Sequence, residues 1–259
     1  MKTIKTIIFL AIISIFFWTC KKENNLINQV EIPAYKLGKL KSEKITESNG
    51  FVHTINYEYN SKGKLSKYNE VTSGSVYGMQ FNQIDSTLNI TYSVNETMNN
   101  QYTALLNYHG FITKETRSDG VNAIPFWYKY NTDGFLTDLY ENWQLSTDTT
   151  TYYHTRFEIQ QSNIIKQFHP SGVIYTYGYY TNYTNNGIYQ IRSRDMAGLT
   201  LYPGYYGNQS VNLIKFKVIS QSPKDTLKYE YSFYDNGKVK NEKCKDGVKI
   251  IKEKEYTYY

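Results

Sequence analysis

Hydrophobic and polar residues alternate with a period of two along most of this 259-residue chain. Tyr229, Tyr231 and Phe233 would share one face of an extended segment, with Glu230 and Ser232 on the other. This period is typical of half-buried β-strands. No window of helical length combines a 3.6-residue period with capping residues, so we expect little or no helix.

A second alternating run lies shortly before this segment. Ile214, Phe216 and Val218 alternate there with Lys215 and Lys217. A regular strand points every second side chain to the same face. The pattern therefore predicts that the three apolar side chains point the same way.

The predicted strands are separated by a recurrent turn, made of an aromatic residue, Asn, two polar residues and Gly. Clear copies span 59–65 and 130–136, a shorter one spans 233–239, and weaker ones span 107–112 and 169–174. Gly supplies the positive φ that such turns need, and Asn or Asp tolerates the neighbouring positions. The repetition predicts an all-β fold, an antiparallel up-and-down meander of about 12–16 strands. A sheet of that size must curl into a barrel or barrel-like shell to avoid a long exposed edge.

The last predicted strand indicates that this barrel is water-soluble. It carries Lys252 and Lys254 on one face and Glu253 and Glu255 on the other. A strand that spans a membrane needs one apolar face, and each lysine in lipid would cost roughly 2–4 kcal/mol.

The N-terminal segment predicts export and a lipid anchor. Lys2 and Lys5 precede an apolar run from Ile7 to Trp18, and Cys20 follows it. The run is shorter than the roughly 20 residues of a membrane-spanning helix, and its form is typical of a signal peptide. We expect a lipoprotein signal peptide over 1–19, lipidation of Cys20, a flexible tether over 20–38 and one barrel-like domain over 39–259. An ordinary secretory signal or an uncleaved anchor is the alternative.

Export limits the partners that the chain would meet. The formal charge of +6 includes Lys2 and Lys5, and an exported protein with this mild basic excess is not expected to bind nucleic acid. We expect a monomer at the outer membrane, periplasmic or surface-exposed, held there by the lipid on Cys20. Lipidation would leave Cys244 without an intrachain disulfide partner. It is either an incidental cysteine at a strand end or a thiol activated by Lys243 and Lys245.

The lipoprotein start, the Tyr-x-Tyr-Asn-x-x-Gly-x-Leu units and the Tyr-rich last strand resemble a Bacteroidetes lipoprotein family of unknown function. The stretch 201–214 is similar to a loop of that family that joins two strands near the C-terminal end. The resemblance covers residues 40–259 and implies a porin-like fold. The turn units also resemble the YD repeats of large bacterial surface proteins and toxins, which build β-shells. Neither family provides catalytic residues to transfer to this chain.

The sequence contains no motif that would indicate an enzyme, a cofactor or a metal. Its four histidines lack the spacing of metal ligands, and neither a nucleophile elbow nor a phosphate-binding loop is present. Asp138 and Glu141 lie close enough in sequence to be considered as the acid pair of a glycoside hydrolase. We expect a non-enzymatic protein, with a glycan-active hydrolase of the cell surface as the alternative.

Aromatic residues are the best functional candidates, since the chain contains 28 tyrosines. Rings on both faces of a strand suit stacking on sugars or on a partner protein. The alternative is that these rings form barrel core and cross-strand ladders. The candidate binding residues are Trp127, Trp143, Tyr177, Tyr179, Tyr205 and Tyr206.

Together these features predict a lipid-anchored envelope protein that binds or scaffolds a glycan or an envelope protein. A deep cleft with two carboxylates at the separation found in glycosidases would favour the hydrolase instead.

Overall fold

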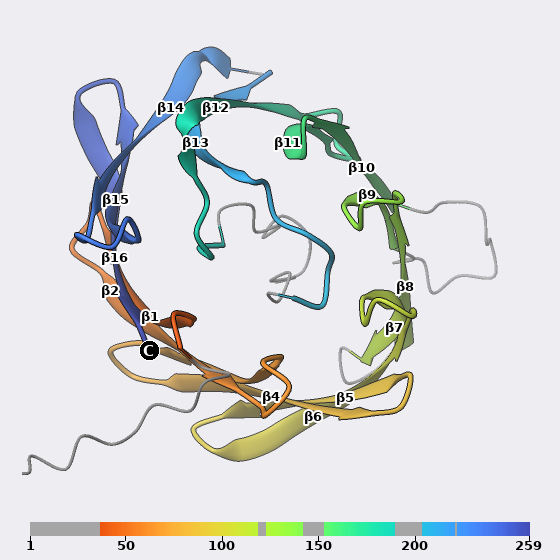
Figure 1. Cartoon of the computed structure of the whole chain (residues 1–259). Coiled ribbons are helices and arrows are strands. Elements are labelled where there is room, and N and C mark those ends of the chain that lie inside the picture. Colours follow the sequence, from red (N-terminus) through yellow and green to blue (C-terminus); the bar gives the residue numbers. More distant parts are fainter. Residues whose placement is uncertain (1–36, 119–122, 142–152, 190–203, 221) are drawn as a thin grey trace, which may run out of the picture. The chain divides into compact units, whose positions relative to one another are not determined.

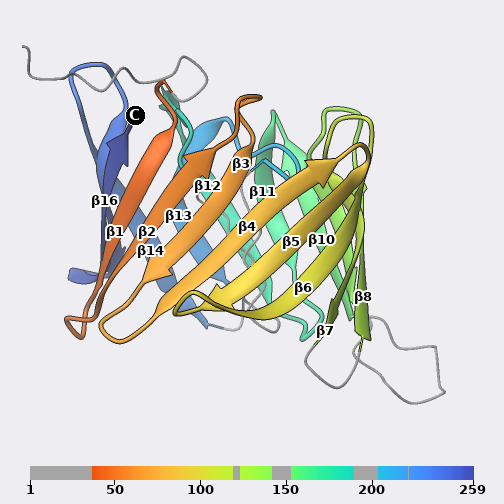
Figure 2. The same ribbon diagram turned by 90° about the horizontal axis from the view of Figure 1, so that it is seen from below.

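The computed structural model describes residues 37–118, 123–141, 153–189, 204–220 and 222–259. These residues form a closed barrel of 16 strands, in which each strand pairs antiparallel with the next and β1 pairs with β16 (Figures 1 and 2). The predicted all-β meander is therefore confirmed, and it closes completely. The strands are β1 (Leu40–Glu47), β2 (Val52–Tyr59), β3 (Leu65–Val71), β4 (Val76–Ile84), β5 (Thr87–Val94), β6 (Thr97–Leu106), β7 (Ile112–Ser118), β8 (Ala123–Tyr130), β9 (Leu136–Glu141), β10 (Tyr153–Gln160), β11 (Asn163–Phe168), β12 (Ile174–Thr184), β13 (Asn212–Ile219), β14 (Ser222–Phe233), β15 (Val239–Asp246) and β16 (Lys249–Tyr258).

The recurrent turns have one shared hydrogen-bond pattern. In the turn after β2, Asn60 N–H donates to Lys64 O at 2.9 Å, and Gly63 N–H donates to Asn60 O at 2.8 Å. The Asn60 side chain also accepts from the N–H groups of Lys62 and Lys64. Gly63 has φ of 71°, which glycine adopts without strain. The same pair of backbone bonds closes the turns at 107–111, 131–135, 169–173 and 234–238.

The inner face of the barrel is built largely from one repeated hairpin unit. One strand supplies an aliphatic residue and, three positions later, Glu or Gln; the next strand supplies Tyr-x-Tyr. In the first copy, Tyr57 donates to the Glu43 carboxylate at 2.7 Å and Tyr59 donates to Leu40 O at 3.0 Å. Equivalent contacts join Tyr128 to Glu115 and Tyr130 to Ile112 O, Tyr177 to Gln167 and Tyr179 to Ile164 O, and Tyr256 to Glu242 and Tyr258 to Val239 O.

The segment 204–211, between β12 and β13, completes this inner face where a hairpin lacks a tyrosine. Phe81 of β4 stands where other copies have tyrosine, and the ring of Tyr205 stacks on it at 5.4 Å. Tyr205 then donates to Leu65 O at 2.9 Å, the bond that a strand tyrosine would have made. Backbone bonds from Ile112 N–H to Tyr205 O and from Asn208 N–H to Gly134 O fasten the segment to β7 and the turn after β8. We call residues 204–211 the inner segment.

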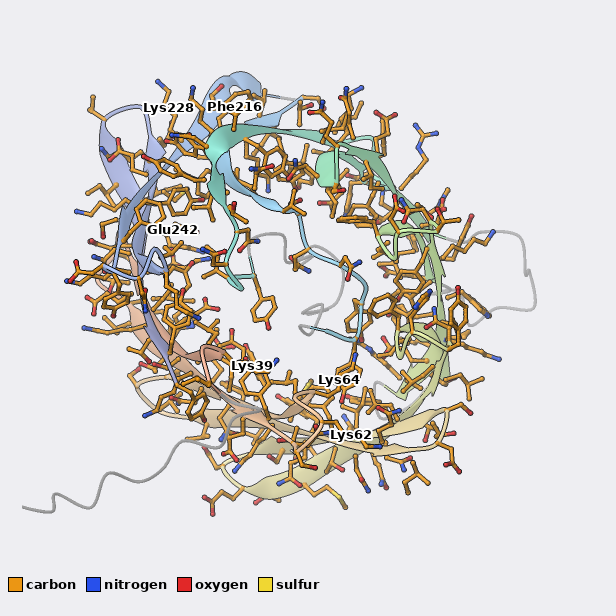
Figure 3. All side chains as sticks on the ribbon, viewed as in Figure 1. Lys39, Lys62, Lys64, Phe216, Lys228 and Glu242 are labelled. Atoms are coloured by element: carbon orange, nitrogen blue, oxygen red, sulfur yellow. The ribbon has the colours of Figure 1, made fainter. Side chains whose placement is uncertain are left out.

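One predicted strand face is wrong. Ile214 is 2 % exposed and belongs to the core, whereas Phe216 (Figure 3) points outward, and Val218, two residues further along the strand, shares its face. The register between β12 and β13 shifts at Gly178/Tyr179, and this irregularity reverses the alternation between Ile214 and Phe216. A Cβ atom on Gly178 would lie 2.2 Å from the ring of Phe216, so this close approach requires glycine.

The outer face of the wall is polar and charged. Lysines pair there with glutamates of the neighbouring strand, and most of these side chains are more than one third exposed. The outer pairs are Lys44–Glu255, Lys67–Glu58, Lys166–Glu158, Lys243–Glu253 and Lys245–Glu230. In the part of the chain that is described, no helix is long and apolar enough to cross a membrane.

Cys244 lies within β15 and not at a strand end. Its thiol is free, and the residue is 5 % exposed on the inner face beside Tyr229. Burial raises the pKa of the Cys244 thiol. A raised pKa keeps the thiol protonated, so the flanking lysines do not activate it.

Candidate functional site

A row of side chains crosses the outer face of β6 to β10. Strand register places Leu105 opposite Lys114, Lys114 opposite Trp127, Trp127 opposite Tyr140 and Tyr140 opposite His154. Neighbouring strands lie about 4.8 Å apart, so the row extends for on the order of 20 Å. We call these five residues the outer row.

The His154 end of the row is held by direct contacts. The rings of Tyr140 and His154 stack with centroids 4.4 Å apart and planes at 6°. His154 Nε2 lies 2.8 Å from an Asp138 carboxylate oxygen, and Lys129 Nζ lies 4.9 Å from the centre of the Tyr140 ring. Ring, cation, imidazole and carboxylate groups therefore meet within one patch of exposed sheet.

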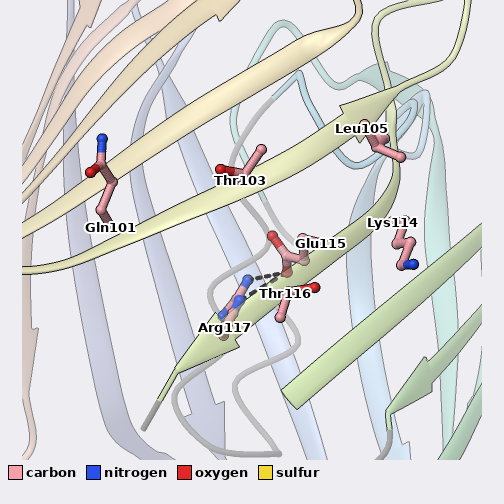
Figure 4. Close-up of a pocket in the computed structure, with 7 residues that line it drawn as sticks. All are labelled: Gln101, Thr103, Leu105, Lys114, Glu115, Thr116 and Arg117. Atoms are coloured by element: carbon pink, nitrogen blue, oxygen red, sulfur yellow. Dashed lines mark hydrogen bonds and ion pairs between the residues drawn. The ribbon is translucent and has the colours of Figure 1, made fainter. Parts of the chain in front are cut away.

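The Leu105 end of the row opens into a surface groove of about 430 Å³ (Figure 4). The groove forms because the ladder between β6 and β7 stops at Thr103–Thr116, although β6 begins at Thr97 and β7 continues to Ser118. Figure 2 shows β6 bending away from β7. The groove is lined by Gln101, Thr103, Leu105, Lys114, Glu115, Thr116 and Arg117.

Behind the groove, a buried polar network occupies the inner face. Glu115 is 1 % exposed and accepts hydrogen bonds from Tyr128 at 2.5 Å, Tyr206 at 3.0 Å and Arg117 Nε at 2.8 Å. Arg117 also donates to the Tyr206 hydroxyl at 3.0 Å, and its guanidinium lies 5.2 Å from the centre of the Phe126 ring. Burial and the charge of Glu115 raise the pKa of Tyr128 well above its ordinary value. The network therefore fixes the floor of the groove and ties it to the inner segment.

The predicted aromatic residues do not form one site. Tyr177, Tyr205 and Tyr206 are buried in the core, and the Tyr179 hydroxyl donates to Ile164 O at 2.5 Å. These four positions match the alternative interpretation, barrel core. Trp127 lies on the outer row, on the opposite face of the wall. Trp143, like Cys20, lies outside the described residues.

The predicted acid pair is separated by the wall. Asp138 faces outward and contacts His154, whereas Glu141 is 2 % exposed and faces the interior. Positions three residues apart in a strand point to opposite faces. Within the described ranges, no group of three or more His, Cys, Asp or Glu residues is arranged to hold a metal ion.

The sequence alone does not identify most residues of this sector. Lys114, Tyr140 and His154 become neighbours of Trp127 only through strand register. Glu115 carried a usable signal, because Ile112-x-x-Glu115 before Tyr128-x-Tyr130 repeats Leu40-x-x-Glu43 before Tyr57-x-Tyr59.

Comparison with known proteins supports the fold. No family model matches the chain, and no curated protein matches it in sequence. A porin-like protein from Bacteroides uniformis superposes with a TM-score of 0.64 and 20 % identity, covering 85 % of this chain and 98 % of that one. A porin-like protein from Bacteroides vulgatus superposes with a TM-score of 0.53 and 11 % identity over the same shares. The chain therefore has a porin-like fold.

Proposed function

We propose that this barrel is a lipid-anchored, non-enzymatic module of the cell envelope that binds glycan on its outer face. The observation that carries the proposal is the outer row, where Trp127, Tyr140 and His154 lie side by side and lead into the groove. Sugar rings pack on aromatic side chains through their C–H faces, and their hydroxyl groups pair with amide, hydroxyl and charged groups. The groove supplies such groups from Gln101, Thr103, Thr116 and Lys114.

The charge of the outer wall supports a barrel surrounded by water. Ion pairs such as Lys44–Glu255 and Lys243–Glu253 stand where a membrane barrel has its lipid-facing apolar band. A barrel of this kind reaches the membrane through an attached group, which is the role that we assign to Cys20. Incorporation of an alkyne-labelled fatty acid, lost in Cys20→Ser, would test this part by itself.

Binding is tested by affinity electrophoresis of the full chain through gels that contain soluble polysaccharides, followed by titration with the glycan that retards it most. Trp127→Ala and Tyr140→Ala should each weaken binding, by roughly fivefold to tenfold, because each removes one packing surface. Tyr108→Ala is the matched control, since Tyr108 is 92 % exposed in the turn after β6 and is not one of the five outer-row residues. Failure of every glycan to retard the chain, or equal losses in all three variants, would refute the proposal.

The hydrolase remains the alternative function and has its own readout. The same glycans are incubated with the full chain, and the release of reducing ends is measured. Turnover that Asp138→Asn or Glu141→Gln abolishes would replace binding by hydrolysis as the function. Our expectation is no release, because the wall separates the two carboxylates.

A further inference from the structure

One rim of the barrel carries a cluster of lysines. It is the rim where β1 begins and β16 ends, and Gly38 N–H donates there to Tyr259 O at 3.0 Å. Figure 3 shows Lys39, Lys62 and Lys64 in one sector of this rim. The cluster, which we call the lysine rim, consists of Lys39, Lys41, Lys62, Lys64, Lys238 and Lys240.

Tyrosine rings lie beside four of these lysines. Lys39 Nζ lies 5.3 Å from the centre of the Tyr59 ring, and Lys41 Nζ lies 5.6 Å from that of Tyr259. The rings of Tyr59 and Tyr259 are themselves 6.3 Å apart. Lys238 and Lys240 contact a second ring pair in the same way, since their Nζ atoms lie 4.5 Å from Tyr258 and 5.7 Å from Tyr234.

The lysine rim gathers six lysines at one end of the barrel without acidic partners among the described residues. Among the described residues, none of the six lysines forms an ion pair, whereas wall lysines such as Lys44, Lys67 and Lys243 each have one. In the two turns of the lysine rim, 60–64 and 234–238, the one acidic residue is Asp235. The pKa of Lys64 is lowered by burial and by the charge of Lys39, as expected for neighbouring cations without a carboxylate between them.

A hollow of about 490 Å³ opens within the lysine rim. Lys238 lies at this hollow, where its ammonium group donates to Gly38 O. Tyrosine, lysine and asparagine groups face the hollow together, a mixture that suits an anionic, oxygen-rich group. Its lining residues are Leu37, Gly38, Tyr234, Asn236, Lys238, Thr257, Tyr258 and Tyr259.

We propose that the lysine rim docks on the anionic headgroups of a phospholipid bilayer. The charge of the rim complements that surface, and each lysine near it adds attraction. Leu37, the first described residue, also lies at the hollow and is 69 % exposed. The tether expected from the sequence over 20–38 would reach on the order of 20 Å if flexible, so an anchor on Cys20 would bring this rim to the bilayer.

Docking of the lysine rim would strengthen the proposed attachment through Cys20. A lipid chain together with a basic patch holds a protein to a membrane better than either signal alone. The orientation that we infer rests on the proposed anchor, whereas the affinity of the rim does not. The outer row would then face sideways from the membrane, on the wall of the barrel and not at its lysine rim.

The test uses the full chain carrying Cys20→Ser, so that lipidation makes no contribution. Co-sedimentation is measured with vesicles of phosphatidylcholine alone and with added phosphatidylglycerol. Lys41→Gln, Lys62→Gln and Lys240→Gln are combined, because these three lysines are exposed. The control combines Lys215→Gln, Lys228→Gln and Lys243→Gln, which remove the same charge from β13, β14 and β15.

We expect the rim triple variant to lose affinity for the anionic vesicles by on the order of 100-fold, with a weaker dependence on salt. The control should bind within about twofold of the parent chain, since its lysines lie on the wall. Equal losses in the two variants, or equal binding to both vesicle types, would overturn the proposal. So would a rim variant that keeps vesicle binding and instead loses an anionic polysaccharide. Fatty-acid labelling of Cys20 and glycan binding by the outer row are measured separately, so their failure is distinguishable from failure of the rim.

Discussion

The inner and outer faces of the barrel wall use acidic residues in different ways. Inside, Glu43, Glu115 and Glu242 are nearly fully buried and accept hydrogen bonds from tyrosine hydroxyls, and Glu115 and Glu242 also pair with the largely buried Arg117 and Lys254. Outside, Glu253 and Glu255 lie opposite lysines and remain exposed to water. The same two-residue period therefore produces a face whose contacts are specific and a face whose contacts are replaceable. Function can vary on the outer face without loss of the barrel.

Raising the pH should destabilise the inner face far more than the outer face. Burial raises the pKa of Tyr205 to about 12, and it raises the pKa of Tyr59, Tyr128 and Tyr231 as well. A tyrosine whose folded pKa lies above its unfolded value binds more protons when folded. Its contribution to stability is full below about pH 10, the unfolded value, and is lost as the pH rises further. We expect cooperative unfolding above that pH.

The measurement combines tyrosinate absorbance with circular dichroism. The buried tyrosines should ionise together with the loss of the β signal, after the exposed ones. Tyr205→Phe removes one raised pKa, so its stability should fall less steeply with pH than that of the parent chain. A single titration near the ordinary pKa with the barrel intact would contradict the prediction.

Removing one acid from each face should give the next largest difference. Glu115→Gln leaves the largely buried Arg117 without its carboxylate, so we expect a loss of about 3 kcal/mol in the free energy of unfolding. Glu253→Gln removes an exposed partner of Lys243 and should cost no more than about 0.5 kcal/mol. Urea denaturation of the two variants tests the contrast. Similar losses would show that the two faces do not differ in the proposed way.

Removing one hydroxyl from each face should give the smallest difference. Tyr57→Phe deletes a 2.7 Å hydrogen bond to Glu43 and should cost about 1 kcal/mol. Tyr140→Phe keeps its stacked ring on the outer row and should stay within about 0.5 kcal/mol of the parent chain. Thermal melts of both variants provide the measurement. If Tyr57→Phe were as stable as Tyr140→Phe, the hydrogen bond from Tyr57 to Glu43 would not stabilise the inner face.

Local sequence signals predicted much of the fold. The turn at Asn60–Gly63 and its copies were recognised because glycine and asparagine act within a few residues of chain. The face of Ile214 was predicted wrongly, because the irregularity that reverses it depends on how β13 pairs with β12. An extra residue in one strand is invisible to a period-two pattern.

The candidate site was predicted only at Trp127, because its other members depend on contacts between different hairpins. Tyr205 looked like an exposed ring, yet it stacks on Phe81 of a distant strand and fills the position of a missing tyrosine. Tyr140 and His154 carry no local signal that would place them beside Trp127. Such neighbours follow from register around a closed sheet, and register is set by the whole ring of strands.

The pairing of β1 with β16 also has a consequence for the order of folding. Tyr259 donates to Tyr57 O across 202 residues of sequence, and Tyr59 packs against the same C-terminal ring. During synthesis, β1 has no partner on this side until β16 (Lys249–Tyr258) has been made. Contacts of such long range are slow to form. The open edge of β1 therefore stays unpaired for longest during folding. It is the edge at greatest risk of pairing with other chains.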